Sequence, residues 1–250
     1  MRVAALAVVA MLLLSVRPSA ATSPAIRSST SSTETADTMS HTVSLPATVE
    51  SGDTLLVFFV ADEVPGITFP GGWNLIETTG NGSALILVSY WKEADGTEDG
   101  TTISVSTTSS QESAHASYAI SGAIDPDTQA PQATENTGAD NSPDPPSISP
   151  TGGSKDYLFL AIAGIDTTST NSISAYPSSY INTGNASSGG GTGVRIGFCT
   201  RALTASSEDP GVFTKSSTES WSTQTIAVHP ASAATKIPLF QHHYKQMRVN

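Results

Sequence analysis

The sequence predicts an all-β fold, a β-sandwich or jelly-roll-like domain built from two internal repeats. The first observation is that the apolar stretch Gly52–Asp62 (GDTLLVFFVAD) returns later in the chain as Lys155–Asp166 (KDYLFLAIAGID). Each stretch is too short to cross a bilayer and is rich in Leu, Val, Phe and Ile, which is typical of a buried strand. The second observation is that short alternating segments are separated by turn signals of Gly, Pro, Asn and Asp.

Shorter matches follow in the same order along both copies, and this order favours a duplication over a chance likeness of Ser- and Thr-rich strands. The matched pairs are Phe69–Trp73 with Tyr176–Tyr180, Leu85–Lys92 with Arg195–Ala202, Glu98–Gly100 with Glu208–Pro210, and Ser113–Ser121 with Ser220–Val228. The spacing between partners drifts slightly, as expected if insertions lie in loops. We therefore expect repeats at residues 40–121 and 147–230, joined by a linker at 122–146.

The N-terminal segment 1–21 has the form of a secretory signal, because Arg2 precedes an apolar run and small residues precede a cleavage point after Ala21. Cleavage there would release an extracellular protein or place it at a surface. An uncleaved helix within an assembly and a wrongly assigned start codon are the alternatives. Residues 22–39 are rich in Ser and Thr without periodicity, which predicts a flexible lead-in.

The first repeat contains a central strand with two apolar faces. The expected strands are Ser40–Leu45, Asp53–Ala61, Trp73–Thr78, Ser83–Lys92, Thr101–Thr107 and Ser113–Ser121. In Asp53–Ala61 both faces are apolar, whereas an antiparallel strand with one face in water alternates. A long loop, the other repeat or another subunit must therefore cover its second face. In the last strand we expect Ala114, Ala116, Tyr118 and Ile120 to point inward.

The second repeat has expected strands at Lys155–Asp166, Val194–Arg201 and Ser220–Val228. The linker is rich in Pro, Asp, Asn and Thr, and it either joins two domains or crosses a sheet face. The repeats could form two sandwiches in tandem or one merged, pseudo-two-fold sandwich, and the two-faced apolar strands favour the merged form. Residues 231–250 are a basic C-terminal tail.

The charge of the chain is low in amount and one-sided, with 11 basic and 22 acidic residues in 250. An acidic field disfavours nucleic acid and anionic membranes as partners, and the mature chain shows no stable membrane span. The single cysteine, Cys199, cannot form an internal disulfide, so the fold depends on its core. On its alternating strand Cys199 is expected to be a small apolar filler.

An acidic segment after the fourth expected strand is the main candidate for chemistry. Glu93, Asp95 and Glu98 match the E-x-D-x-x-E spacing of a jelly-roll glycosidase family, whose reaction needs two carboxylates facing one cleft. Two Asp-Gly pairs favour a turn instead of a strand here, so we expect no catalytic residues. Asp95, Glu98 and Asp99 could bind calcium through their oxygens, although no 12-residue calcium loop is present.

Two aromatic residues occupy matched positions after a proline turn. Trp73 and Tyr180 could stack on sugar rings, or they could close the ends of the sandwich. His115 shares a strand with serines, but no G-x-S-x-G motif or orienting acid is evident, so an exposed strand histidine is the better interpretation. Asn81 and Asn185 begin glycosylation sequons that are short enough to arise by chance.

The segments SHTVSLP, SGDTLLVFFVAD, FPGGWNLI and QESAHASYAISGA, followed by KDYLFLAIAGID and TQTIAVHPA, resemble a group of uncharacterised proteins from tailed-phage, prophage and environmental viral genomes. The resemblance covers about residues 28–232. It implies a virion-associated or tail-region β protein and implies no particular activity. The signal-like start and the basic tail depart from that pattern.

Three hypotheses of function follow from these observations. The leading one is a non-enzymatic structural or adhesion protein that presents a β-sandwich at a virion or cell surface, with itself or other virion or surface proteins as partners. The second is a secreted carbohydrate-binding module that binds glycans through Trp73 and Tyr180. The third is a secreted glycoside hydrolase that uses Glu93, Asp95 and Glu98.

Overall fold

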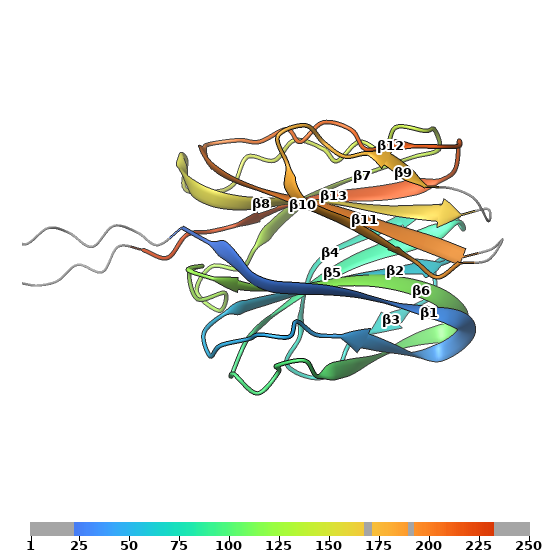
Figure 1. The fold of residues 1–250 in the computed structure, drawn as a ribbon, viewed down its shortest axis with the longest axis horizontal. Coiled ribbons are helices and arrows are strands. Elements are labelled where there is room, and N and C mark those ends of the chain that lie inside the picture. The colour runs from blue at the N-terminus through green and yellow to red at the C-terminus, as the bar shows by residue number, and fades with distance from the viewer. Residues whose placement is uncertain (1–22, 168–171, 190–192, 233–250) are drawn as a thin grey trace, which may run out of the picture. The chain divides into compact units, whose positions relative to one another are not determined.

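The computed structural model describes residues 23–167, 172–189 and 193–232, and in these ranges the chain is all β without a helix (Figure 1). The signal-like segment 1–21 and nearly all of the basic tail lie outside the described residues. The strands are β1 (Ala25–Ser44), β2 (Thr54–Asp62), β3 (Ile67–Thr68), β4 (Asn74–Asn81), β5 (Leu85–Glu93), β6 (Thr102–Ser121), β7 (Gln132–Gly138), β8 (Lys155–Thr167), β9 (Ile173–Ala175), β10 (Ile181–Ser187), β11 (Gly193–Ala205), β12 (Thr214–Lys215) and β13 (Trp221–Val228).

Two antiparallel sheets with the same strand order form the body of the described chain. The first has the order β1-β6-β2-β5-β4, with β3 beside β6, and the second has the order β7-β13-β8-β11-β10. Each sheet comes from one continuous part of the chain, and its second strand lies at the centre. The shared order agrees with the matched sequence segments, while the duplication itself and a jelly-roll topology stay predictions.

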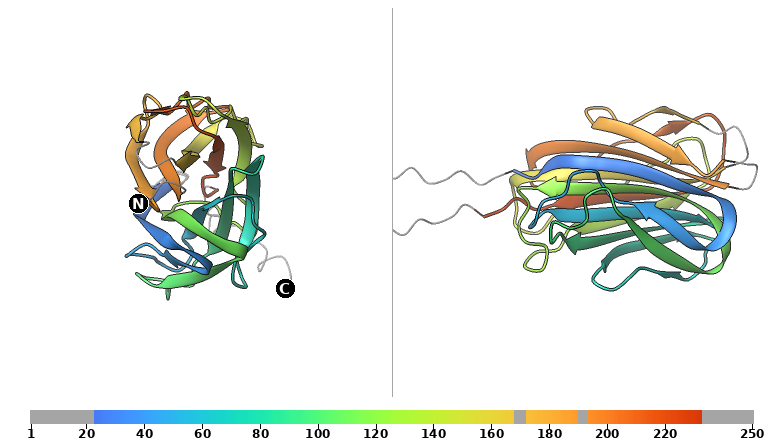
Figure 2. Two further views of the ribbon diagram at one scale, coloured as in Figure 1. Left: turned by 90° about the vertical axis from the view of Figure 1, so that its right-hand side faces the viewer. Right: turned by 60° about the horizontal axis from the view of Figure 1, so that its bottom comes forward.

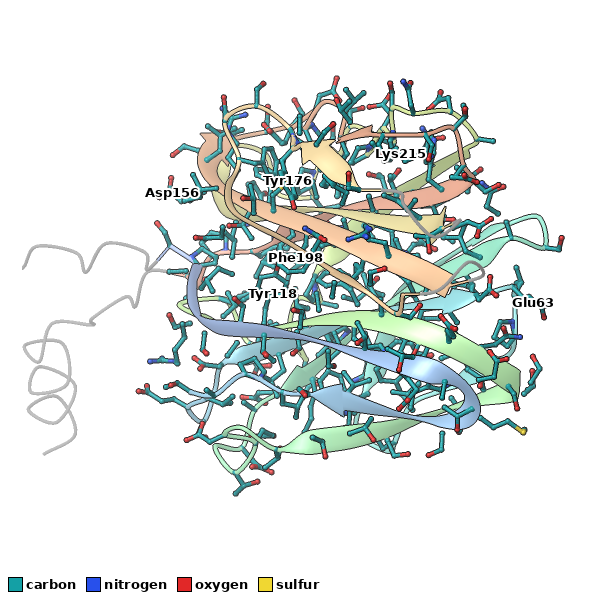
Figure 3. All side chains as sticks on the ribbon, turned by 45° about the vertical axis from the view of Figure 1, so that its right-hand side comes forward. Glu63, Tyr118, Asp156, Tyr176, Phe198 and Lys215 are labelled. Carbon is teal, nitrogen blue, oxygen red and sulfur yellow. The ribbon has the colours of Figure 1, made fainter. Side chains whose placement is uncertain are left out.

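The inner faces of the two sheets share one hydrophobic core, so the sheets form a single sandwich (Figure 2). Leu56 and Phe58 of β2 belong to the same cluster as Leu160 and Ile162 of β8. Between the sheets, the Tyr118 ring meets the Phe198 ring edge-on at 6.1 Å (Figure 3). The inward positions expected in the last strand of the first repeat are confirmed, because the side chains of Ala114, Ala116, Tyr118 and Ile120 all lie in this core.

The outer face of the first sheet is covered by a folded-back ribbon of its own two longest strands. The pairing of β1 with β6 shifts register between Glu34 and Thr38 and again between Thr38 and Ser40. Such bulges bend a ribbon, and here residues 38–45 and 101–108 return across the sheet; we call these two segments the flap. Val43 and Val105 of the flap pack with Phe59 of β2 in a second apolar cluster.

The outer face of the second sheet is covered by loops of the same half of the chain. Ile148, Tyr180 and Phe213 pack in one cluster with Tyr157 and Phe159 of β8. Thr223 and Thr225 of β13 donate hydrogen bonds to the carbonyls of Asp144 and Pro146. On the inner side, each two-faced apolar strand is covered by the other half of the chain. On the outer side, the flap covers β2 and loops cover β8.

Two boundary predictions are wrong. The lead-in expected to be flexible at residues 22–39 lies largely in β1, and the linker at 122–146 contains β7. Both strands are edge strands that bond to one neighbour only, β1 to β6 and β7 to β13. Since an edge strand can be held mainly by its ladder, it needs no apolar alternation, and Thr suits the pleated surface.

Both ends of the described chain leave the sandwich at the same end (Figures 1 and 2). Ala25 pairs with Ser121 at the last position of β6. The next residue, Gly122, accepts a hydrogen bond from the Ala231 amide at 3.0 Å. The turn at residues 82–84 and the bend of the flap lie at the opposite end.

Candidate functional site

The loop between β5 and β6 holds the three carboxylates for which the sequence predicts calcium binding. Glu98 is buried, with 7 % of its side chain exposed, and its Oε1 lies 2.7 Å from Lys92 Nζ. Its Oε2 accepts the amides of Gly96 at 3.0 Å and Thr97 at 3.2 Å. Burial raises the pKa of Glu98, but the ammonium group and the amides outweigh it and hold this pKa below its ordinary value. Glu98 is therefore an anion satisfied by the amides of its own loop and by Lys92 of β5.

The other two predicted calcium ligands also bond to the backbone around them. Asp95 Oδ1 accepts the amide and the hydroxyl of Thr97 at 2.9 and 2.6 Å, and Asp99 accepts the Val49 amide. Among the described residues these carboxylates do not converge on one point. Calcium binding by Asp95, Glu98 and Asp99 therefore stays a prediction, and no convergence among the described residues supports it, because each carboxylate already bonds to the turn.

The contacts of Glu98 also argue against a glycosidase that uses the E-x-D-x-x-E spacing. A hydrolase of that kind needs one of its carboxylates free to act as nucleophile or acid, and Glu98 is held by Lys92 and three amides. The second sheet has a matching pair, in which Arg201 Nη1 lies 2.8 Å from the buried Glu208 carboxylate. In both halves a buried glutamate joins a loop to the strand that precedes it, which is a structural role.

Trp73 and Tyr180 do not form matching platforms for a ligand. Tyr180 is 7 % exposed and lies in the outer cluster of the second sheet, where burial raises the pKa of its hydroxyl. The burial of Tyr180 in this outer cluster leaves no open ring face on which a sugar could stack. Trp73 is partly buried, and its ring lies 6.0 Å from that of Phe69. For Trp73, ligand binding stays a prediction.

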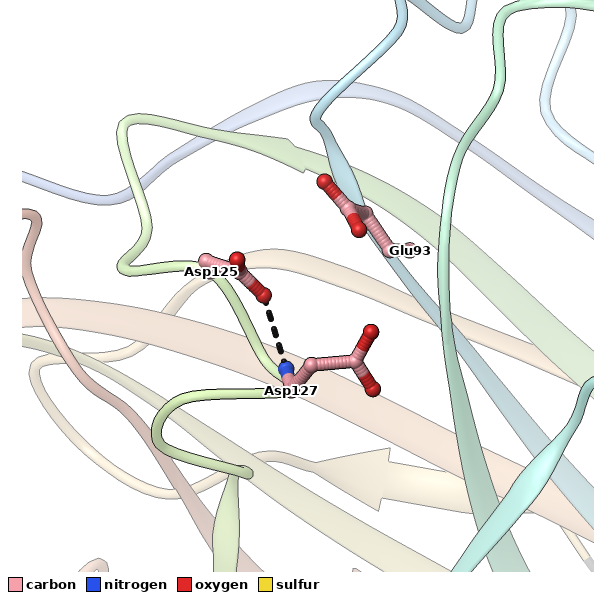
Figure 4. A group of neighbouring side chains, drawn as sticks. All are labelled: Glu93, Asp125 and Asp127. Atoms are coloured by element: carbon pink, nitrogen blue, oxygen red, sulfur yellow. Dashed lines mark hydrogen bonds between the residues drawn. The ribbon is translucent and has the colours of Figure 1, made fainter.

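One exposed group of carboxylates does converge, at the end of the sandwich where the described chain enters and leaves. Glu93, at the end of β5, lies beside Asp125 and Asp127 of the loop that follows β6 (Figure 4). One carboxylate oxygen from each lies within 4.8 Å of the others, and the Asp127 amide donates to Asp125 Oδ1 at 2.8 Å. Oxygen ligands of this kind suit a hard cation such as calcium. The sequence separated these residues by a strand, so spacing alone did not indicate them.

A chain of buried polar side chains lies between the flap and the first sheet. His41 and His115 are fully buried. The Ser113 hydroxyl lies between them, 2.7 Å from His41 Nδ1 and 2.8 Å from His115 Nε2. The prediction that His115 is exposed is wrong, because the flap covers the face on which its side chain lies. No approach from solvent reaches Ser113, which is also fully buried, so this Ser–His contact is not a hydrolytic site.

The sequon asparagines have different roles in the structure. Asn81 Nδ2 donates to the carbonyls of Gly138 at 2.7 Å and Trp221 at 2.9 Å, and so it joins the first sheet to the second. Asn185 is exposed, and its Nδ2 donates to the Tyr176 hydroxyl. The nitrogen that a glycan would modify is thus engaged in both residues, with two carbonyls of the second sheet in Asn81 and with a surface hydroxyl in Asn185.

The remaining candidate, Cys199, agrees with its expected role as a filler. It is fully buried, and burial raises the pKa of its thiol. A buried thiol of this kind is not reactive.

Comparison with known proteins gives no relative: no family model, no curated protein and no solved structure matches this chain. In the part of the chain that the structure describes, no helix is long and apolar enough to span a membrane. The described residues define an all-β, sandwich-type protein, and its function has to be argued from its own geometry.

Proposed function

We propose that this chain is a non-enzymatic structural or adhesion module that presents its sandwich at the surface of a virion or a cell. The observation that carries the proposal is the common exit of the two ends, because Ala25 and Ala231 both lie beside Ser121 and Gly122. Segments that continue from both residues can hold the sandwich by one end. The turn at residues 82–84 and the bend of the flap would then face away from the attachment.

The use of the polar side chains supports the same proposal. Glu98 and Glu208 are held in internal ion pairs, and Ser113 is sealed between two histidines. The resemblance of residues 28–232 to phage proteins also supports a role in a particle. The carbohydrate-binding alternative has weaker support, because Tyr180 is buried and only Trp73 is left to stack on a sugar.

Fractionation of the native source tests the proposal. Purified particles, membranes and soluble secretion would be compared by quantitative mass spectrometry of sandwich peptides. We expect enrichment with particles or with the cell surface. Recovery of the protein only as a soluble monomer would refute the proposal.

Orientation can be tested on the same material with two single-cysteine variants. Ser83→Cys lies at the end opposite the exits and Ser154→Cys at the end that bears them; both positions are exposed, while the native Cys199 is buried. On intact particles or cells an impermeant maleimide should label the Ser83→Cys variant as fast as in the isolated protein and the Ser154→Cys variant more slowly. The reverse pattern would contradict attachment through the shared end.

A further inference from the structure

In the row of hydrogen-bonded side chains beneath the flap, the donor and the acceptor of each bond can be assigned, starting from Thr107. Thr107 Oγ1 donates its hydrogen to the Ser109 carbonyl at 2.8 Å. It can therefore only accept from His41 Nε2, which lies 3.0 Å away. His41 thus carries its hydrogen on Nε2, and its Nδ1 is an acceptor.

The same reasoning extends to the second histidine. Because His41 Nδ1 accepts, the Ser113 hydroxyl donates to it, and Ser113 Oγ must accept from His115 Nε2. His115 Nδ1 then accepts from the Ser32 hydroxyl at 3.0 Å, and Ser32 Oγ accepts the Ser44 amide of the flap at 3.1 Å. Every polar hydrogen of these side chains then donates one hydrogen bond, and both imidazole rings are neutral.

A proton added to either ring breaks this arrangement. It would bind at Nδ1, the ring nitrogen that carries no hydrogen in either histidine, and turn this acceptor into a donor. On His41 the new N–H would face the Ser113 hydroxyl, whose oxygen already accepts from His115. On His115 it would face the Ser32 hydroxyl, whose oxygen already accepts the Ser44 amide. At His41 the Ser113 hydroxyl hydrogen is then left without an acceptor in a fully buried site, which is unfavourable. At His115 the partly buried Ser32 hydroxyl must turn its hydrogen away from the ring, so the hydrogen bond between Ser32 and His115 is reversed.

The surroundings offer little to compensate a positive charge. The Phe59 ring of β2 stacks on His115 at 4.8 Å and meets His41 edge-on at 5.2 Å. Burial is the main cause that lowers the pKa of His41, against a smaller opposing effect of Glu34. Burial, and then the proximity of His41, lower the pKa of His115 to about 3. Among the described residues, Glu34 of β1 is the carboxylate that acts on His41. Glu63, after β2, accepts a hydrogen bond from Gln111 of β6, and β3 contributes Ile67.

We propose that the flap is a pH-sensitive latch, closed while His41 and His115 are neutral and opened when either is protonated. The two register shifts at Glu34, Thr38 and Ser40 mark where the ribbon would hinge. Opening would uncover the apolar face formed by Val57 and Phe59, while the second sheet and the shared core stay folded.

Hydrogen exchange of the full chain measures this opening directly. Amides of residues 38–45 and 101–108 would be compared with those of residues 159–163 in β8 at pH 7.5 and 4.5, after correction for the intrinsic pH dependence of exchange. The His115 pKa of about 3 when buried, against about 6.5 when exposed, predicts about 100-fold more opening at the lower pH from this residue alone. The flap should lose protection by roughly this factor, with little change in β8. Equal protection of the flap at both pH values would overturn the proposal, and so would a parallel loss in the flap and β8.

Histidine variants distinguish opening caused by protonation of His41 and His115 from opening caused by protonation of other groups. His41→Phe combined with His115→Phe should remove the pH dependence of flap exchange, whereas His229→Gln, at a third buried histidine near β13, should preserve it. If the double variant does not fold, the wild-type imidazole NMR titration decides. Both rings should become protonated only together with the loss of flap protection. Titration near pH 6.5 with a protected flap would overturn the latch.

Discussion

Replacing Asn81 by alanine should weaken the contact between the two sheets at one edge of the sandwich. The amide nitrogen of Asn81 donates to the carbonyls of Gly138 and Trp221 at 2.7 and 2.9 Å. A net hydrogen bond is worth about 1 kcal/mol, and a buried carbonyl left without a donor adds to the loss. We expect the free energy of unfolding to fall by about 2–3 kcal/mol. For a domain of this size, that corresponds to a melting temperature lower by about 4–12 °C.

Asn185→Ala is the matched control, because this second sequon asparagine is exposed and contacts Tyr176 and Arg195 at the surface. Its loss should change the free energy of unfolding by less than about 0.5 kcal/mol. Urea unfolding and calorimetry at pH 7 would compare both variants with the parent protein. If Asn81→Ala unfolds at the same midpoint as Asn185→Ala, the proposed inter-sheet role of Asn81 is wrong.

Three further substitutions test the charged groups. Glu98→Gln should lower the free energy of unfolding by about 1–2 kcal/mol, because Lys92 and three amides lose their anion. Thermal melts should show the same loss with and without calcium. A loss seen only with calcium would instead favour a calcium site at Glu98. Burial raises the pKa of Asp62 to about 6, so its ionisation destabilises the fold above pH 6 and not below about pH 4. Asp62→Asn should therefore raise stability by about 1 kcal/mol at pH 7 after solvent screening, and an equal gain at pH 4 in urea titrations would contradict this sign. Arg27→Ala should lower the urea midpoint, because the buried Asp53 loses a two-pronged partner; an unchanged midpoint would show that solvent replaces the guanidinium.

The centre of each sheet could be predicted because burial on both faces leaves a strong sequence signal. The runs in β2 and β8 are almost wholly apolar, and the inward side of β6 alternates as expected. The edge strands β1 and β7 could not be predicted in this way. Their backbone bonds to one neighbour, while their side chains are mostly Ser, Thr, Asn and Gln, a composition that is equally typical of a loop.

The site beneath the flap was missed for a different reason. Alternation correctly puts His115 on the side opposite Ala114 and Ala116, yet that side is buried and not exposed. Two register shifts send the ribbon back over the sheet, and no periodicity marks where a ribbon folds over. The matched positions of Trp73 and Tyr180 misled for a related reason, since a shared place in two halves does not imply a shared exposure.

The construction of each sheet from one continuous part of the chain has a consequence for assembly. The contact between the sheets is, in chemical terms, an interface between two associating fragments, and the loop that joins β6 to β7 serves as their tether. A tether of this kind raises the effective concentration of one fragment near the other and adds no contact of its own. A chain cut in this loop should therefore remain a paired, non-covalent complex. Either fragment alone exposes a complete apolar sheet face and should associate with another apolar surface instead.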